Sequence, residues 1–185
     1  MAKKFIVNDD SVLNDRGFRV LTSGIRLGRF AKNPLGLFNH IRPDRWDFKK
    51  DGILPIGLWS IPQVEGTTLT AEITFDQNDD FAKRIESKVE GGFLRMTSLG
   101  LIPITTSSDP RYLLPGQERE TLVESELVEI TITDIGSNPN TLALYSVDAS
   151  GNLVELTSDT EAQHIPLIVK PQEEPENKPN MKKIA

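Results

Sequence analysis

Apolar and polar residues alternate along much of the chain with the two-residue period of a β-strand. The clearest example is residues 67–75, where Leu, Ala, Ile and Phe are separated by Thr and Glu. This period is typical of a sheet that packs one face against a core and leaves the other in water. We expect the segment to pair with residues 53–64 in a hairpin that turns at Glu65-Gly66.

Similar patterns predict further strands. They are expected at residues 5–7, 18–21, 34–40, 91–103 and 119–135, with a bend near 124–126, and as a final hairpin of residues 141–147 and 153–156. The Thr-, Ser- and Pro-rich residues 105–117 predict a loop. A loop of this length is a candidate for a flap over a substrate.

One segment has a clear helical period. Its apolar residues fall on one helix face, namely Phe81, Ala82, Ile85 and Val89. Asn78 is the expected N-cap, and Gly91 is expected to end the helix.

Six or more strands with one clear helix indicate a mainly β member of the α+β class. We expect a closed or barrel-like antiparallel sheet flanked by a few helices. The 185 residues, 37% hydrophobic and 26% charged, suffice for one domain with its own core. Four of the twelve prolines lie between Pro166 and Pro179, among Glu, Gln, Asn and Lys. We therefore expect a domain at residues 1–165 and a flexible linker or tail at residues 166–185.

Composition argues against several functional classes. The net charge is −6 and the Lys and Arg residues are scattered, so we expect no nucleic-acid partner. The chain has no cysteine and two histidines, and it lacks an EF-hand spacing, so we expect neither a metal nor another cofactor. We expect no membrane partner, because no stretch has the length and apolarity of a signal peptide core or a membrane span.

Three polar residues interrupt or end apolar strands and have complementary chemistry. Ser98 lies beside Gly100 in an apolar strand, His40 ends another, and Glu129 lies within a third. A serine hydroxyl needs a nearby base to become a nucleophile, and a histidine base is oriented by a carboxylate on its other ring nitrogen. Taken singly, each residue is equally consistent with an ordinary strand position. No Gly-x-Ser-x-Gly elbow, Ser-x-x-Lys motif, P-loop or dinucleotide fingerprint competes with this set.

The motifs around these residues occur in a distinctive order. They are Asn39-His40 after an apolar run, Ser98-Leu99-Gly100, and Leu127-Val128-Glu129-Ile130-Thr131 followed by Gly136-Ser137-Asn138-Pro139. This order resembles the prohead proteases of tailed bacteriophages, which are related to the herpesvirus assemblins. The resemblance covers about residues 30–144. It departs from the family where Thr131 replaces the usual serine and where the last turn lacks the Pro-Ala-Asn-Pro pattern.

The resemblance implies an assemblin-like fold and a serine endopeptidase that processes phage or prophage capsid and scaffold proteins during prohead maturation, with self-cleavage. It implies His40, Ser98 and Glu129 as the catalytic residues and backbone N–H groups at Gly136 and Ser137 as oxyanion donors. It also implies capsid and scaffold polypeptides as substrates, and a homo-oligomer or assembly-dependent dimer. The expected location is the cytoplasm of the bacterial host, within the assembling prohead.

Alternatives to this interpretation stay open. The assemblins use a second histidine as the third catalytic residue, so His164 is an alternative to Glu129. The chain is alternatively a catalytically inactive capsid or scaffold module, in which the three residues are ordinary strand positions. We also expect that the chain is the protease part of a longer translation product and that Ala185 is a processing point, because the linker otherwise has nothing to join.

Overall fold

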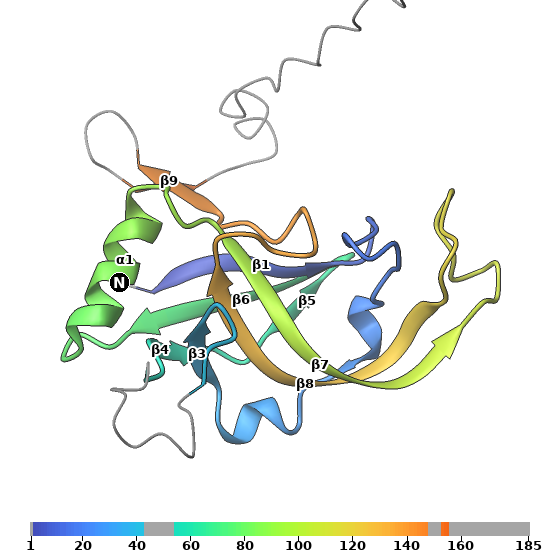
Figure 1. Cartoon of the computed structure of the whole chain (residues 1–185), viewed down its shortest axis with the longest axis horizontal. Coiled ribbons are helices and arrows are strands. Elements are labelled where there is room, and N and C mark those ends of the chain that lie inside the picture. Colours follow the sequence, from blue (N-terminus) through green and yellow to red (C-terminus); the bar gives the residue numbers. More distant parts are fainter. Residues whose placement is uncertain (1, 43–53, 148–152, 156–185) are drawn as a thin grey trace, which may run out of the picture.

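One strongly curled sheet dominates the protein. In the computed structural model, residues 2–42, 54–147 and 153–155 are described. Within these residues the sheet forms an open half-barrel with one α-helix beside it (Figure 1). The expected mainly β class is therefore confirmed, whereas the described strands form an open rather than a closed barrel. The other helical segments in this part are two short 3₁₀ turns, η1 (Thr22–Gly24) and η2 (Phe30–Lys32).

The main sheet has eight strands in the order β1-β6-β4-β3-β8-β2, with β5 also paired to β6 and β7 to β8. Strands β2 and β3 run parallel to β8, and the other pairs are antiparallel. The bounds of these strands are β1 (Lys3–Asp9), β2 (Ile25–Arg26), β3 (Leu35–Phe38), β4 (Gly57–Trp59), β5 (Gln63–Glu65), β6 (Thr68–Phe75), β7 (Met96–Ser107) and β8 (Thr121–Thr133). A separate hairpin, as expected, joins β9 (Tyr145–Val147) and β10 (Leu153–Glu155).

Strands β7 and β8 form the longest pair and curve across the molecule (Figure 1). Their register shifts between Gly100 and Leu101 and twice more between Pro103 and Thr106. The second group of shifts lies opposite Glu124 and Ser125, where the sequence predicts a bend. Such bulges increase the local twist of a strand, so they allow this long pair to curl.

The burial pattern of β6 follows the alternation of apolar and polar residues in its sequence. Its residues Leu69, Ala71, Ile73 and Phe75 are all buried, as predicted. The other arm of the predicted hairpin divides into two strands, β4 and β5. Pro62 lies between them and has no N–H to donate to a hydrogen bond with β6. At the centre of the core, Phe5 meets Trp59 edge to face, with ring centroids 5.7 Å apart.

The predictions for residues 18–21 and 105–117 are wrong. Residues 18–21 form no strand and contact β8 through one bridge, Val20 to Leu122. The Leu21 carbonyl, which would continue the pairing, instead accepts from the Gly24 N–H at 3.1 Å in η1. The predicted loop at residues 105–117 starts later, because β7 continues as far as Ser107.

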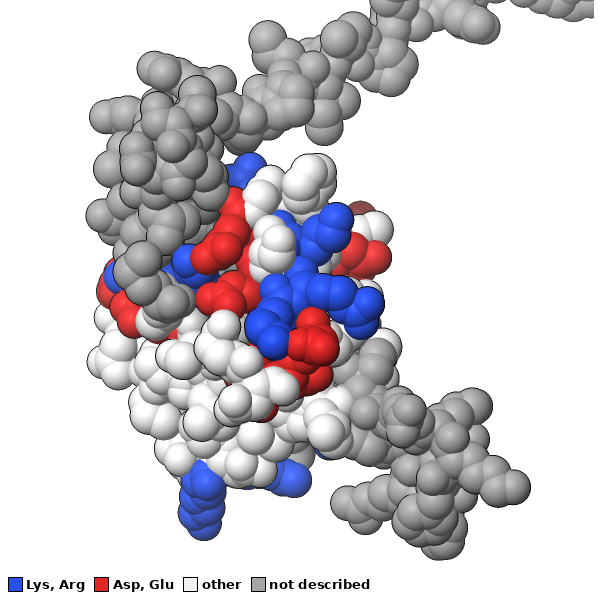
Figure 2. Space-filling view, turned by 90° about the vertical axis from the view of Figure 1, so that its left-hand side faces the viewer, with Lys and Arg blue, Asp and Glu red and all other residues white. Residues whose placement is uncertain are grey.

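The helix α1 (Asp80–Glu90) buries Ala82, Ile85 and Val89, as its period predicts. Its N-cap is Asp79 rather than the predicted Asn78. The Asp79 carboxylate accepts from the N–H groups of Phe81 and Ala82, at 3.0 and 3.2 Å. Acidic and basic side chains are interleaved on the side of the molecule where α1 lies (Figure 2).

Several expectations concern residues outside the described part, namely His164, the domain boundary at residue 165 and the linker at residues 166–185. Among the described residues, no helix is long and apolar enough to cross a membrane.

Replacing Asp79 by Ala should lower the free energy of unfolding by about 1 kcal/mol, because two N-terminal N–H groups of α1 lose their acceptor. Urea unfolding followed by circular dichroism measures this change. The matched variant Asn78→Ala should change stability by much less, since the structure assigns the cap to Asp79. A larger loss in Asn78→Ala would show that the cap is Asn78.

Candidate active site

Three neighbouring strands bring the predicted catalytic residues together. Strand β8 lies between β7 and β3, and Ser98 on β7 is the register partner of Thr131 on β8. On the other side of β8, Phe38 at the end of β3 is the partner of Ile132, and His40 follows two residues later. Glu129 precedes Thr131 by two residues, so it points to the same face of β8.

His40 contacts both other residues. Its Nδ1 lies 2.7 Å from Glu129 Oε1, and its Nε2 lies 3.0 Å from Ser98 Oγ. An ionised carboxylate only accepts hydrogen bonds, so Nδ1 carries the proton of a neutral ring and Nε2 is left to accept from the serine hydroxyl. This is the arrangement in which a histidine acts as general base toward a serine.

His40 occupies an unusual turn. Asn39 and His40 both have positive φ, at 49° and 56°, and the turn is closed by the Ile41 N–H donating to the Phe38 carbonyl at 3.0 Å. Two adjacent non-glycine residues in this region carry roughly 1–3 kcal/mol of strain each, which the surroundings must offset.

Strand β8 supplies the contacts that hold this turn. The Asn39 N–H donates to the Ile132 carbonyl at 2.9 Å, and the His40 N–H donates to Thr131 Oγ1 at 3.2 Å. Thr131, which is fully buried, is thus a positioning residue for His40. A serine at this position would carry the same hydroxyl group and so the same acceptor for the His40 N–H.

Glu129 is buried, with 8% of its surface exposed, and both of its carboxylate oxygens are engaged. Oε1 faces His40, whereas Oε2 accepts from Arg42 Nε at 2.9 Å and also from Arg42 Nη2. Burial is the largest single influence and raises the pKa of Glu129. The hydrogen bonds and charges of His40 and Arg42 together outweigh it, so the net pKa lies below its ordinary value. Glu129 is therefore ionised at neutral pH.

Gly100 makes room for the Glu129 side chain. The two residues are register partners, and a Cβ placed on Gly100 would lie 2.5 Å from Glu129 Cγ and 2.9 Å from Oε1. The absence of a side chain at Gly100 therefore lets the glutamate lie against the backbone of β7. The glycine two residues after Ser98 is thus part of the geometry of the site.

A cavity of about 510 Å³ opens beside Ser98 and His40. Its apolar lining comes from β1, the 11–20 segment, β7, the start of β8 and the turn after β8. It includes Val7, Val12, Phe18, Val20, Leu99, Leu101, Leu122 and Ile135. The loop after Ser107 contributes none of the described lining residues. The expected role of that loop as a substrate flap is therefore not supported by its position.

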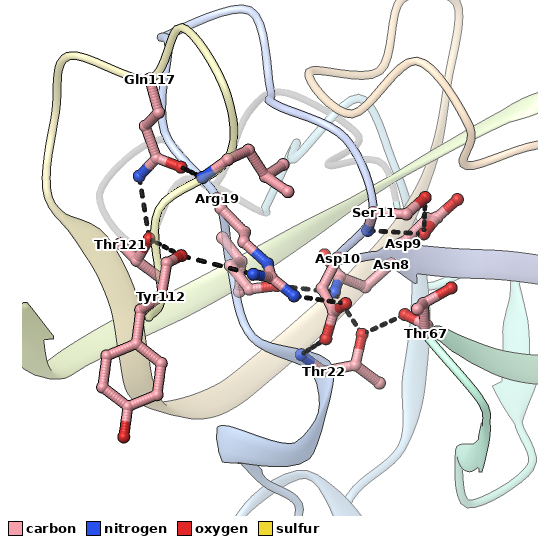
Figure 3. A network of polar contacts seen from close by, with 12 residues as sticks. Asn8, Asp9, Asp10, Ser11, Arg19, Thr22, Thr67, Tyr112, Gln117 and Thr121 are labelled. Atoms are coloured by element: carbon pink, nitrogen blue, oxygen red, sulfur yellow. Dashed lines mark hydrogen bonds and ion pairs between the residues drawn. The ribbon is translucent and has the colours of Figure 1, made fainter. Parts of the chain in front are cut away.

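A buried polar network fixes one wall of this cavity (Figure 3). The Asp10 carboxylate accepts from the Thr22 N–H at 3.0 Å and from Arg19 Nη2 at 3.1 Å. Thr22 Oγ1 accepts from Asn8 Nδ2 at 2.8 Å and donates to the Thr67 carbonyl at 2.7 Å. These bonds hold the two ends of the segment between Asp10 and Thr22, which carries several of the lining residues.

The turn nominated for oxyanion binding lies at the same cavity. Ser137 lines it, and its carbonyl accepts from the Asp15 N–H at 2.8 Å. The Gly136 N–H instead donates to Met96 Sδ at 3.4 Å.

Asp9 anchors this turn to β1. Its carbonyl accepts from Asn138 Nδ2 at 2.8 Å, and its carboxylate accepts from Asn140 Nδ2 at 2.6 Å. Burial, the largest influence, raises the pKa of Asp9, but hydrogen bonds from Asn140 and its neighbours bring the net pKa below the ordinary value. The anchoring carboxylate is therefore ionised at neutral pH.

Sequence reasoning missed the supporting residues Arg42 and Thr131. Arg42 follows His40 at the start of a charged segment, and its contact with Glu129 depends on β3 lying parallel to β8. The one usable signal was its position two residues after His40.

Comparisons of the chain with protein-family models, curated proteins and solved structures found no match. Within the part of the chain that the structure describes, no group of three or more His, Asp and Glu residues is placed to hold a metal ion.

Replacing Gly100 by Ala should disable the site while leaving the fold intact, because the new methyl group displaces the Glu129 side chain from His40. We expect at least a tenfold loss in the rate at which Ser98 reacts with a serine-directed fluorophosphonate. The matched variant is Gly28→Ala, where a Cβ meets no atom within 4 Å. Equal labelling of wild type and Gly100→Ala would contradict the role assigned to Gly100.

Proposed function

We propose that this protein is a serine endopeptidase in which Ser98 is the nucleophile, His40 the general base and Glu129 the residue that orients the base. The observation that supports this most directly is the continuous set of contacts from Glu129 Oε1 through the His40 ring to Ser98 Oγ, at 2.7 and 3.0 Å. The cavity beside Ser98 gives a substrate access to this set.

The proposed reaction follows the chemistry of these groups. Ser98 Oγ attacks the carbonyl carbon of the scissile bond while its proton passes to His40 Nε2, and Glu129 stabilises the resulting imidazolium. His40 then gives that proton to the departing amine as the C–N bond breaks, which leaves an acyl ester on Ser98. Water, deprotonated by His40, hydrolyses the ester and restores the serine.

The free edge of β7 favours a polypeptide as the substrate. The Thr97 N–H donates to the Thr141 carbonyl at 3.0 Å, so the main-chain groups of Thr97 face away from β8. By strand alternation, those of Leu99 and Leu101 face the same edge, where no described strand pairs beyond Thr97. Pro103 follows in the same series, and a proline suits an unpaired edge. An extended peptide can add to such an edge as a further strand.

The motif order supports a more specific role. Because the motifs around His40, Ser98 and Glu129 resemble those of prohead proteases, we propose an assemblin-like fold and phage capsid and scaffold polypeptides as substrates. The same resemblance favours self-cleavage and activity as a homo-oligomer or assembly-dependent dimer. The site of action is then the assembling prohead in the bacterial cytoplasm.

Ser98→Ala and His40→Ala should each abolish proteolysis, whereas Glu129→Gln should retain partial activity, because the base survives but loses its charged partner. A fluorophosphonate probe followed by intact mass measurement reports on the nucleophile, and scaffold cleavage on a gel reports on proteolysis.

The control for this experiment is assembly state, since an assembly-dependent protease in dilute solution would be silent. Labelling and cleavage are therefore measured for the free protein and for protein co-expressed with its capsid and scaffold polypeptides. Near-normal cleavage by Ser98→Ala would refute the assignment. Absence of labelling in both states would favour the inactive capsid or scaffold module.

Ile135→Glu should lower kcat/KM for polypeptides about tenfold or more, because this side chain, 79% exposed, lines the cavity and the change replaces an apolar contact with a charge. Reaction with a small fluorophosphonate should change little. The matched control is Ile104→Glu, at a residue 45% exposed on β7 that does not line the cavity. Equal effects of the two variants would show that the cavity does not bind the substrate.

A further inference from the structure

We propose that Arg42 is a positioning residue for the triad: its guanidinium holds the Glu129 carboxylate so that Oε1 faces His40 Nδ1. This inference rests on the proposed function for its consequence in catalysis, but its structural part can be tested without activity. The observation behind it is that the two oxygens of the buried Glu129 carboxylate have different partners, His40 for Oε1 and Arg42 for Oε2.

A carboxylate can turn about its Cγ–Cδ bond, so one contact does not fix it. Arg42 contacts Oε2 through both Nε and Nη2, and Nε lies 2.9 Å from that oxygen. With Oε2 held by two donors, the direction of Oε1 is also set. Oε1 then lies 2.7 Å from His40 Nδ1. Holding the carboxylate thus also favours the ring tautomer in which Nε2 accepts from Ser98.

The contact is made on the side of Glu129 that faces away from the nucleophile. A second cavity of about 500 Å³ lies there, and Arg42, Arg29 and Glu129 are its charged lining residues among the described part of the chain. Arg42 thus reaches Glu129 without occupying the cavity beside Ser98. Its side chain is 58% exposed, whereas that of Glu129 is 10% exposed.

The charges around Glu129 give Arg42 a second effect. From the turn after β3 the carboxylate faces His40 and Arg42, and from β7 it faces Gly100, which has no charge. Arg29 lines the same cavity but pairs with Glu126, at 3.6 Å. Burial raises the pKa of Glu129, and Arg42 is one of the two residues that lower it. Removing Arg42 leaves the burial in place, so the pKa of Glu129 should rise.

The position of Glu129 separates this pair from ordinary surface pairs. Arg26–Glu124 and Arg29–Glu126 join partly exposed groups on β2 and the following turn to β8, and neither carboxylate contacts a histidine. Exposed ion pairs of that kind contribute little to the stability of a protein. At Glu129 the same type of ion pair acts on a buried group that contacts His40 directly.

The test compares Arg42→Met with Arg42→Lys and with the control Arg29→Met, which removes a guanidinium from the same cavity but not from Glu129. The first readout is the titration of the Glu129 carboxyl carbon by ¹³C NMR, assigned with Glu129→Gln. The second is the rate of Ser98 labelling by a fluorophosphonate as a function of pH. Melting temperatures show whether each variant folds, and Arg42→Gln replaces Arg42→Met if that variant does not.

Arg42→Met should raise the pKa of Glu129 and slow labelling at neutral pH by about tenfold, a modest effect because Arg42 is half exposed. The acid limb of the labelling profile should move to higher pH, because Glu129 must be ionised to orient His40. Arg42→Lys should change the Glu129 pKa and the labelling rate less than Arg42→Met does, since an ammonium keeps the charge but not the paired donors. Arg29→Met should match wild type in both.

The outcomes separate this inference from the proposed function. An unchanged Glu129 titration and labelling profile in Arg42→Met would overturn the role of Arg42, even if wild type labels at Ser98. A raised Glu129 pKa in a protein that never labels would support the Arg42 contact and refute the protease. Equal effects of Arg42→Met and Arg29→Met would also overturn the inference, because they would indicate a general effect of cavity charge.

Discussion

The pairing of β8 with two different neighbours is the constraint on which the rest of the site depends. β7 pairs with it antiparallel and β3 pairs with it parallel, so a serine from one strand and a histidine from the end of the other meet over the same face. A slip of one residue in either register would turn the side chains of one strand to the opposite face. The buried Ile130 and Ile132 and the bulges in the long pair resist such a slip.

Much of the fold could be predicted from local patterns. The alternation in β6, the period of α1 and the turn-rich gaps each reflect interactions between residues close in sequence. The errors lie at the ends of elements, which local patterns do not fix. Residues 18–21 have a β-like composition, but they contact β8 through one bridge before the chain turns into η1. The N-cap moved from Asn78 to Asp79, a difference of one residue that sequence patterns do not resolve.

The candidate site shows the same division. Ser98, His40 and Glu129 could be nominated because each is a reactive side chain within an apolar segment and because the motifs around them resemble those of prohead proteases. The structure places the three side chains in contact. The residues that position these three side chains could not be predicted. The Thr131 hydroxyl accepts from the His40 backbone N–H, and Arg42, which follows β3, reaches Glu129 on the adjacent parallel strand β8. The local sequence does not show which strands are neighbours. The three reactive residues could therefore be predicted from the sequence, whereas the residues that position them could not.

The same geometry favours a carboxylate over a histidine as the third residue of the proposed triad. The alternative raised by the assemblins is a histidine, and a neutral imidazole has one acceptor and one donor nitrogen. A histidine at the place of Glu129 would use its acceptor for His40 Nδ1–H and would then present N–H toward Arg42, which is also a donor. A carboxylate has an acceptor oxygen for each neighbour, and both are used here. The guanidinium beside the site thus suits a glutamate at this position better than a histidine, which makes Arg42 and Glu129 a matched pair.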